Sequence, residues 1–273
     1  MILSRISVLF ILVTTLAGCV SSPVAPSFNS NDSKALNIVR AAGISAKLED
    51  RVVPINTVTG ITDSAGYGVA LAASGYNAPI PGFSPGQMAG LNFTSWLFAP
   101  QADTARNSFF AWFPSNISDG QPVDEMSDML KDASIAAAND LGYKAREGYI
   151  KNKSALFVHM TKASDPICKN EGNCFISYGI RTPRSTVAPD FVGTAGDSFF
   201  FDPAGKDYSR FFFNKNFVGF NELEFLVKVS QYMPEWFYFY IAPKKIKIDE
   251  NTKIRMPLIV NQGRVHHFIK SEP

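Results

Sequence analysis

The chain has 273 residues, and its 26 Lys and Arg against 24 Asp and Glu give a formal net charge of +2 at pH 7. Charged residues make up only 18% of the sequence, and no run of Lys or Arg is long enough to follow a phosphate backbone. This composition argues against a nucleic-acid partner, and beyond the N-terminal region no hydrophobic segment reaches the ~20 residues of a transmembrane helix.

The N-terminus has the pattern of a secretory signal segment. Arg5 supplies a positive charge, and Ile6 to Leu16 is an apolar run that is too short to cross a membrane as a helix. The run closes on Leu16-Ala17-Gly18-Cys19, where small residues permit cleavage just before a cysteine.

This segment resembles the signal peptide and lipobox of bacterial lipoprotein precursors. The resemblance covers residues 1 to about 22 and identifies no functional family. It implies diacylation of the Cys19 thiol, cleavage before Cys19 and acylation of the new N-terminus, which together anchor the chain stably in a bilayer. Because Val20 and Ser21 rather than Asp follow Cys19, it also implies the periplasmic face of the outer membrane.

These features divide the chain into three parts. Residues 1–18 are the expected signal peptide, residues 19–32 the lipidated Cys19 with a flexible tether, and residues 33–273 a single α+β periplasmic domain. The tether is predicted because its residues are mostly Ser, Pro and Asn and show no periodic apolar face. The mature chain of about 250 residues is long enough for one large domain.

Two helices are expected in the N-terminal part of this domain. The stretch Ser33–Ala42 is predicted to be a helix that ends at Gly43. A second helix is predicted from Ser84, as N-cap, and Pro85, at the first helical position, to about Phe98.

The middle of the chain combines strands with a long helix. A strand within 107–114 precedes a helix over 122–141, which begins at Pro122 and ends at Gly142. Apolar residues recur along this helix at intervals of three and four, and they predict one buried face that comprises Val123, Met126, Leu130, Ala133, Ala137 and Leu141. Strands at 155–160 and 174–180 follow, so the predicted fold class is α+β, a mainly antiparallel sheet with packed helices.

Two cysteines remain once Cys19 is lipidated. Cys168 and Cys174 flank a short polar loop that contains Gly172, and the periplasm is oxidising, so the two are predicted to form a disulfide. A redox-active dithiol is the alternative, but such pairs usually have Cys-x-x-Cys spacing at the start of a helix. We therefore interpret this pair as a structural cross-link.

The C-terminal part is rich in aromatic residues and follows a predicted loop at Pro183–Pro189. Phe199–Phe201 and Phe211–Phe213 are short runs that place rings on both faces of a strand. Such a strand is either covered on both sides or exposes an aromatic face that binds a partner or a glycan. The remaining predicted elements are a helix that begins after Asn221 and ends at Pro234, a strand at 235–241, and a terminal hairpin with arms at 258–260 and 265–269.

The strand at 235–241 alternates two kinds of aromatic residue. Trp236, Tyr238 and Tyr240 carry polar tips, whereas the residues between them are purely apolar. This alternation predicts a half-buried strand whose outer face meets water, sugar or another protein. The three residues are the candidate partner or ligand surface.

Several motifs for catalysis are absent from the sequence. It lacks His-Glu-x-x-His, a phosphate loop and Ser-x-x-Lys. His266 and His267 are consecutive on a predicted strand and should point to opposite faces, and His159 is predicted to be packed or at a sheet edge. We therefore expect no metal and no cofactor, and an enzyme is disfavoured although it is not excluded.

The leading interpretation is a lipid-anchored envelope protein. It would act as a non-enzymatic scaffold or accessory subunit of an envelope-spanning assembly of the secretion, conjugation or pilus type, with another envelope protein as its partner. That range of assemblies comes from the class of such lipoproteins and not from a sequence match. The alternatives are a lipoprotein that binds peptidoglycan or an apolar ligand, and an envelope hydrolase.

Overall fold

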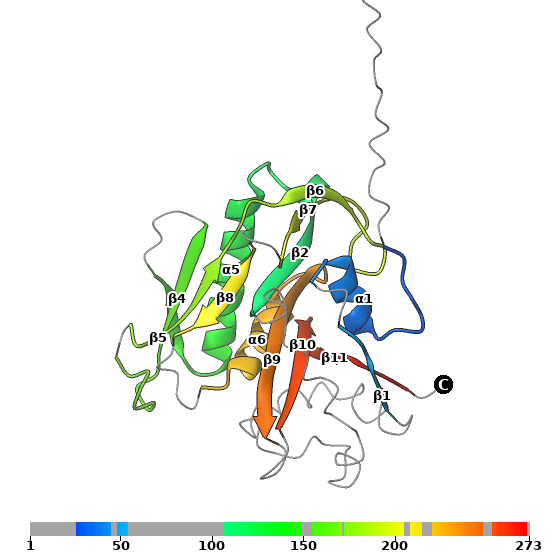
Figure 1. Ribbon diagram of the computed structural model, residues 1–273. Helices are drawn as coiled ribbons and strands as arrows, with labels where there is room; N and C mark the ends of the chain where they lie inside the picture. Colours follow the sequence, from blue (N-terminus) through cyan, green and yellow to red (C-terminus); the bar gives the residue numbers. More distant parts are fainter. Residues whose placement is uncertain are drawn as a thin grey trace, which may run out of the picture.

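The computed structural model describes residues 26–44, 48–53, 106–148, 154–170, 172–204, 208–214, 220–247 and 253–271. The expected signal peptide, Cys19 and the helix predicted at 84–98 lie outside these residues. The described part contains three α-helices and a large antiparallel sheet (Figure 1), which confirms the predicted α+β class.

The described helices lie where the sequence predicts them. They are α1 (Lys34–Ala41), α5 (Pro122–Asp140) and α6 (Glu222–Tyr232), with a short 3-10 helix η2 (Ser115–Ile117) before α5. At the start of α1 the Ser33 hydroxyl accepts a hydrogen bond from the Leu36 amide at 3.0 Å. At the start of α6 the Asn221 side chain accepts one from the Glu224 amide at 3.2 Å. Both side chains therefore pair an amide that a helix start leaves without an intrahelical partner.

Twelve strands are described. They are β1 (Arg51–Val53), β2 (Ser108–Pro114), β3 (Lys144–Glu147), β4 (Ala155–Thr161), β5 (Cys174–Gly179), β6 (Arg184–Ala188), β7 (Gly196–Phe201), β8 (Arg210–Phe213), β9 (Phe237–Lys247), β10 (Lys253–Asn261), β11 (Arg264–His267) and β12 (Ile269–Ser271). The strands predicted in 107–114, at 155–160, 174–180 and 235–241, and the terminal hairpin, are confirmed by β2, β4, β5, β9 and the β10–β11 pair.

One predicted loop is wrong. The segment Pro183–Pro189 contains β6, which pairs antiparallel with β7 from Arg184 against Phe200 to Ala188 against Gly196. Within the described residues β6 pairs only with β7, and three of its five side chains are exposed. A short and mostly exposed segment between two prolines fits such an outer strand as well as it fits a loop.

The sheet is centred on β2. Ten strands form one sheet in which the main path runs β11-β10-β9-β2-β8-β5-β4-β3, while β7 pairs with β2 and β6. Every pair in this sheet is antiparallel. β8 pairs with the first residue of β2 and β7 with its last four, so β7 and β8 lie one after the other along the same side of β2. β1 and β12 form a separate parallel pair.

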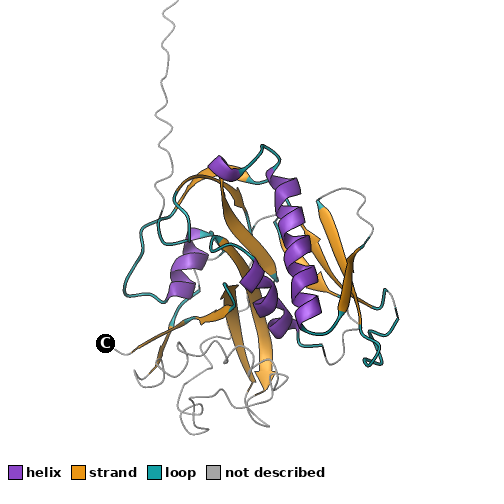
Figure 2. Ribbon diagram, turned by 180° about the vertical axis from the view of Figure 1, so that it is seen from behind, coloured by secondary structure: helices purple, strands orange, loops and turns teal. Residues whose placement is uncertain are grey.

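Helices cover the two faces of the sheet unequally. α5 and α6 pack on one face (Figure 2), where their buried residues join Phe109, Ala111 and Phe113 of β2 in one core. The predicted apolar face of α5 is confirmed, since Leu130 at its centre is fully buried. The opposite face carries a second core, in which α1 meets Phe110 of β2 together with residues of β7, β9 and β10. The half of the sheet formed by β3, β4, β5 and β8 contributes to the first core only.

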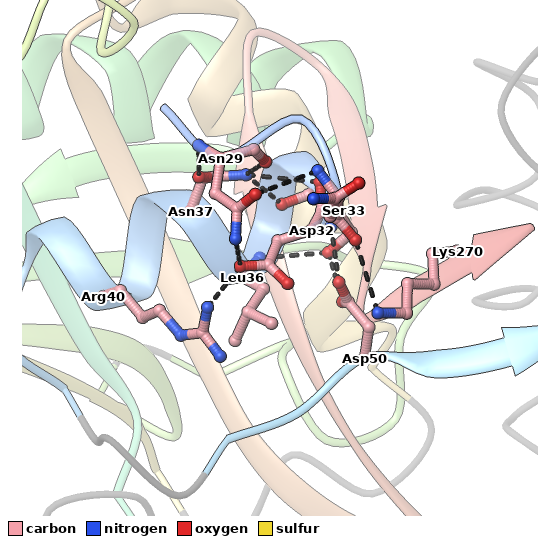
Figure 3. A network of polar contacts seen from close by, with 9 residues as sticks. Asn29, Asp32, Ser33, Leu36, Asn37, Arg40, Asp50 and Lys270 are labelled. Carbon is pink, nitrogen blue, oxygen red and sulfur yellow. Dashed lines mark hydrogen bonds and ion pairs between the residues drawn. The ribbon is translucent and has the colours of Figure 1, made fainter. Parts of the chain in front are cut away.

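The segment before α1 is hydrogen-bonded to it, which shortens the predicted tether of residues 19–32 at its C-terminal end. The Asn37 side chain of α1 accepts a hydrogen bond from the Asn29 amide at 2.7 Å. Its Nδ2 atom donates to the carbonyl oxygens of Asn29, Asp32 and Ser33 at 2.9, 3.2 and 3.0 Å (Figure 3). Asp32 also pairs with Arg40. Residues 29–32 are therefore part of the folded body and not of a free linker.

A second set of contacts ties the same region to the end of the chain. Asp50 accepts hydrogen bonds from both the amide and the hydroxyl of Ser33 (Figure 3). Burial raises the pKa of Asp50 above its ordinary value, although these two hydrogen bonds act in the opposite direction. Directly after Asp50, β1 pairs with β12, and Lys270 of β12 donates to the Asn31 carbonyl oxygen at 3.3 Å. The N-terminal arm and the C-terminal strand are thus linked through one polar network.

Candidate binding surface

The structure does not place the three predicted surface aromatics on a surface. The exposed fractions of Trp236, Tyr238 and Tyr240 are 6%, 1% and 0%. Tyr238 and Tyr240 belong to the core under α1, while Trp236 precedes β9 and packs against Phe113 with ring centroids 5.0 Å apart. The prediction of an outward face is wrong because β9 lies between β10 and β2, inside the sheet, and both of its faces are covered.

The predicted disulfide is confirmed. Cys168 and Cys174 are bonded, with their Cα atoms 5.3 Å apart. The bond joins the loop after β4 to the first residue of β5, so it fixes the connection between two neighbouring strands. Cys19 lies outside the described residues, and its lipidation stays a prediction.

His266 and His267 are adjacent on β11 and hold their Nε2 atoms away from solvent. Burial lowers the pKa of His266 to about 3, with the positive charge of Lys34 as the next cause, and burial lowers the pKa of His267 to about 4. Both imidazoles are therefore neutral near pH 7. Within the described residues no group of three or more His, Cys, Asp or Glu is placed to hold a metal ion.

Lowering the pH from 7 to 5 is expected to destabilise the fold through these two histidines. In the unfolded chain each imidazole titrates at its ordinary pKa of 6.5. As the pH falls, the unfolded state therefore takes up protons before the folded state does. The contribution of the two histidines to the free energy of unfolding is fully present above pH 6.5 and is lost as the pH falls toward 4. The slope approaches about 1.4 kcal/mol per pH unit for each imidazole. Denaturant unfolding at pH 7, 6 and 5 measures it, and His266→Gln should flatten the curve. Equal stability of the wild type at pH 7 and 5 would contradict the assignment.

The strands β3, β4, β5 and β8 carry α5 on one side only. In Figure 1 β4, β5 and β8 lie in front of α5, and in Figure 2 α5 lies in front of the strands, so the two views agree. On the other side no helix among the described residues covers these strands. We call this side the open face. The strand registers place on it Lys144 and Arg146 of β3, Phe157 and His159 of β4, Phe175, Ser177 and Gly179 of β5, and Arg210 and Phe212 of β8.

Aromatic rings form a connected cluster on the open face. Phe175 lies at its centre, with its ring centroid 5.8 Å from that of Phe157, 5.5 Å from that of His159 and 6.4 Å from that of Phe212. The two Phe–Phe contacts with Phe175 are edge-to-face, a favoured geometry for aromatic pairs. Phe212 is 46% exposed, and the other three rings are half-buried.

Cationic side chains border this cluster. Lys144 and Arg146 lie on β3, and both are exposed. Arg210 lies on β8, and its side chain extends across Gly179 of β5, where an added Cβ would come within 3.2 Å of the Arg210 Cγ atom. None of the described residues that the registers place on the open face is acidic. The open face therefore combines an apolar centre with a positive border.

Part of this surface has a signal in the sequence. The run Phe211–Phe213 predicts rings on both faces of its strand, and the structure buries Phe211 and Phe213 while it exposes Phe212. The alternation in β4 likewise separates buried Val158 from half-buried Phe157. Neither pattern says which side of the sheet a helix covers, so the sequence alone does not select the open face.

No protein-family model, curated protein or solved structure matches this chain. Similarity to known proteins therefore supplies no function. Among the described residues, no helix is both long enough and apolar enough to cross a bilayer.

Proposed function

We propose that this protein is a lipid-anchored envelope protein that acts as a non-enzymatic scaffold or accessory subunit and holds a partner protein on its open face. The lipobox at Leu16–Cys19 supports the anchor and, with Val20 after Cys19, the periplasmic face of the outer membrane. The observation that carries the binding role is the aromatic cluster around Phe175, which remains uncovered by any described helix. Aromatic residues and Arg are enriched at the centres of protein interfaces.

The contacts of the segment before α1 support a folded body that is held near the membrane. The Phe28 ring packs edge-to-face on Phe191 with centroids 5.5 Å apart, and hydrogen bonds to α1 begin at Asn29, so we propose that the linker from Cys19 ends at about Phe28. Such a linker spans at most about 30 Å when it is fully extended. α1 lies on the same side of the sheet as the open face, because Phe110 of β2 and Phe212 of β8 share that side. α1, to which Asn29 is hydrogen-bonded, and the proposed partner site therefore lie on one side of the sheet.

Replacing Cys19 with Ala tests the anchor. We expect the variant to lose incorporation of labelled palmitate completely and to appear in the soluble or unprocessed fraction, because the acylated thiol is gone. Ser21→Ala is the matched control and should keep both the label and the membrane fraction. Palmitate labelling of Cys19→Ala at the wild-type level would overturn the lipoprotein proposal.

Crosslinking in intact cells tests the scaffold role. A photoreactive residue at position 212 should give a discrete crosslinked envelope protein, and the same residue at position 117 of η2 should not. Ile117 is a suitable control since it is also exposed and apolar but lies outside the open face. Identical products from both positions would overturn the assignment of the open face, and products that contain only peptidoglycan would favour a glycan-binding lipoprotein instead.

A further inference from the structure

The open face has a chemistry that narrows the kind of partner it fits. Its centre is built from carbon-rich rings, and three of its border residues are Lys144, Arg146 and Arg210. Because none of its described residues is acidic, a bound positive segment would meet only like charges. A segment that combines apolar side chains with carboxylates would match both the centre and the border.

From this pattern we propose that the open face binds an acidic, apolar peptide segment of a partner protein. The inference rests on the proposed scaffold function and deepens it. Phe212 and Phe175 contact the apolar side chains of the segment. Arg210 and Lys144 pair with its carboxylates, and Arg210 can do so with the two parallel hydrogen bonds that a guanidinium offers.

A neutral glycan fits this face less well. Sugar hydroxyls donate as well as accept hydrogen bonds, so a site that pairs them fully offers acceptors as well as donors. On the open face Ser177 is buried, and the Thr161 hydroxyl at its edge lies 3.4 Å from the Lys144 carbonyl oxygen, to which it donates. The described residues of this face therefore supply stacking surface and positive charge but few acceptors for sugar hydroxyls.

A bilayer surface also fits less well. Insertion between lipids needs apolar side chains that protrude, and of these four rings Phe212 is the exposed one. Phe157, Phe175 and His159 are half-buried and in contact with one another on a sheet surface. A peptide laid across β4, β5 and β8 can reach all of these rings, since neighbouring strands are about 4.8 Å apart.

Fluorescence anisotropy with the full lipidated chain in detergent tests the proposal. The probe is a labelled decapeptide of alternating Glu and Leu with one central Phe, and the comparison peptide has Lys in place of Glu. We expect the acidic peptide to bind at least about tenfold more tightly than the basic one, and its affinity to fall as salt rises.

Two variants assign the binding to the open face. Arg210→Glu should weaken binding of the acidic peptide by about tenfold or more, and Phe212→Ala by about fivefold or more, as expected for Arg and aromatic contacts at an interface centre. Lys169→Glu in the disulfide loop and Val187→Ala on β6 are the matched charge and apolar controls, and both positions are exposed. The controls should bind like the wild type, and thermal melts should show all four variants folded.

Three outcomes would overturn the proposal. They are equal affinity for the acidic and basic peptides, full binding by both Arg210→Glu and Phe212→Ala, and stronger binding to purified peptidoglycan or to vesicles of anionic phospholipid than to the acidic peptide. Each of these results leaves the palmitate labelling of Cys19 unchanged, so failure of the peptide proposal and failure of the lipoprotein proposal are distinguishable.

Discussion

Replacing Leu130 with Asp is expected to unfold the body of the protein. Leu130 lies at the middle of α5, its side chain is 0% exposed, and it belongs to the core between α5, α6 and the sheet. An Asp there would bury a charge among the apolar side chains of this core. Such a change costs several kcal/mol, a large part of the ~5–15 kcal/mol that stabilises a typical domain.

Asp128→Lys is the matched control on the same helix. The Asp128 side chain is 55% exposed, and it accepts a hydrogen bond from Lys131 at 2.9 Å. Losing an exposed pair of this kind costs about 0.3–0.5 kcal/mol. Thermal melts followed by circular dichroism should therefore show no folded transition for Leu130→Asp and a near-normal one for Asp128→Lys. A wild-type melting temperature for Leu130→Asp would show that the buried face of α5 is wrongly assigned.

Tyr238→Ala is expected to cost about 3–5 kcal/mol of stability, the range found when a large buried ring is truncated. The Tyr238 ring stacks on Phe110 with centroids 5.3 Å apart and meets the edge of Trp112 at 6.0 Å. Removing it opens a cavity between the sheet and α1 that rigid neighbours on β2 and β9 cannot close.

Tyr232→Ala provides the comparison, with the same residue type at an exposed position. Tyr232 is 49% exposed on α6, and its hydroxyl donates to Asp140 at 2.8 Å. The midpoint of denaturant unfolding should fall strongly for Tyr238→Ala and only slightly for Tyr232→Ala. Similar midpoints for the two variants would mean that the core under α1 contributes little to the fold.

The same tyrosine shows where sequence patterns stop being informative. The alternation of Tyr238 and Tyr240 with Phe237 and Phe239 predicts that one face of β9 is exposed to solvent. That prediction holds for a sheet that is covered on one side only. Here α1 covers the other side, although about 200 residues separate it from β9. Pairing of elements so far apart in the chain depends on tertiary packing, which periodicity within a single strand does not encode.

Local signals were sufficient for elements with strong caps or a clear apolar period. Gly43 predicted the end of α1 and the cap Asn221 the start of α6, and the 3–4 spacing around Leu130 predicted the buried face of α5. Strand β3 was not predicted, because it is four residues long, charged and at the edge of the sheet. Edge strands of this composition resemble loops in sequence.

The open face was predictable from the sequence only in part. The aromatic run at Phe211–Phe213 marked the region, and its middle ring is the exposed one. The positive border was not visible, since Arg146 and Arg210 are far apart in sequence and share a face only through the registers of β3, β4, β5 and β8. The open face is thus assembled from single residues of several strands.

The network around Asn37 has a mechanical consequence for a protein fixed to a membrane. In the anchored state that we propose, tension between the bilayer and a partner would enter the described body at Phe28 and Asn29, where the Phe28 ring packs against Phe191 and Asn37 binds the Asn29 amide and carbonyl groups. From there the force would pass into α1. It would also pass through the hydrogen bonds between Ser33 and Asp50 into the β1–β12 pair. These hydrogen bonds and the contact between Phe28 and Phe191 would be the first described interactions to carry that load.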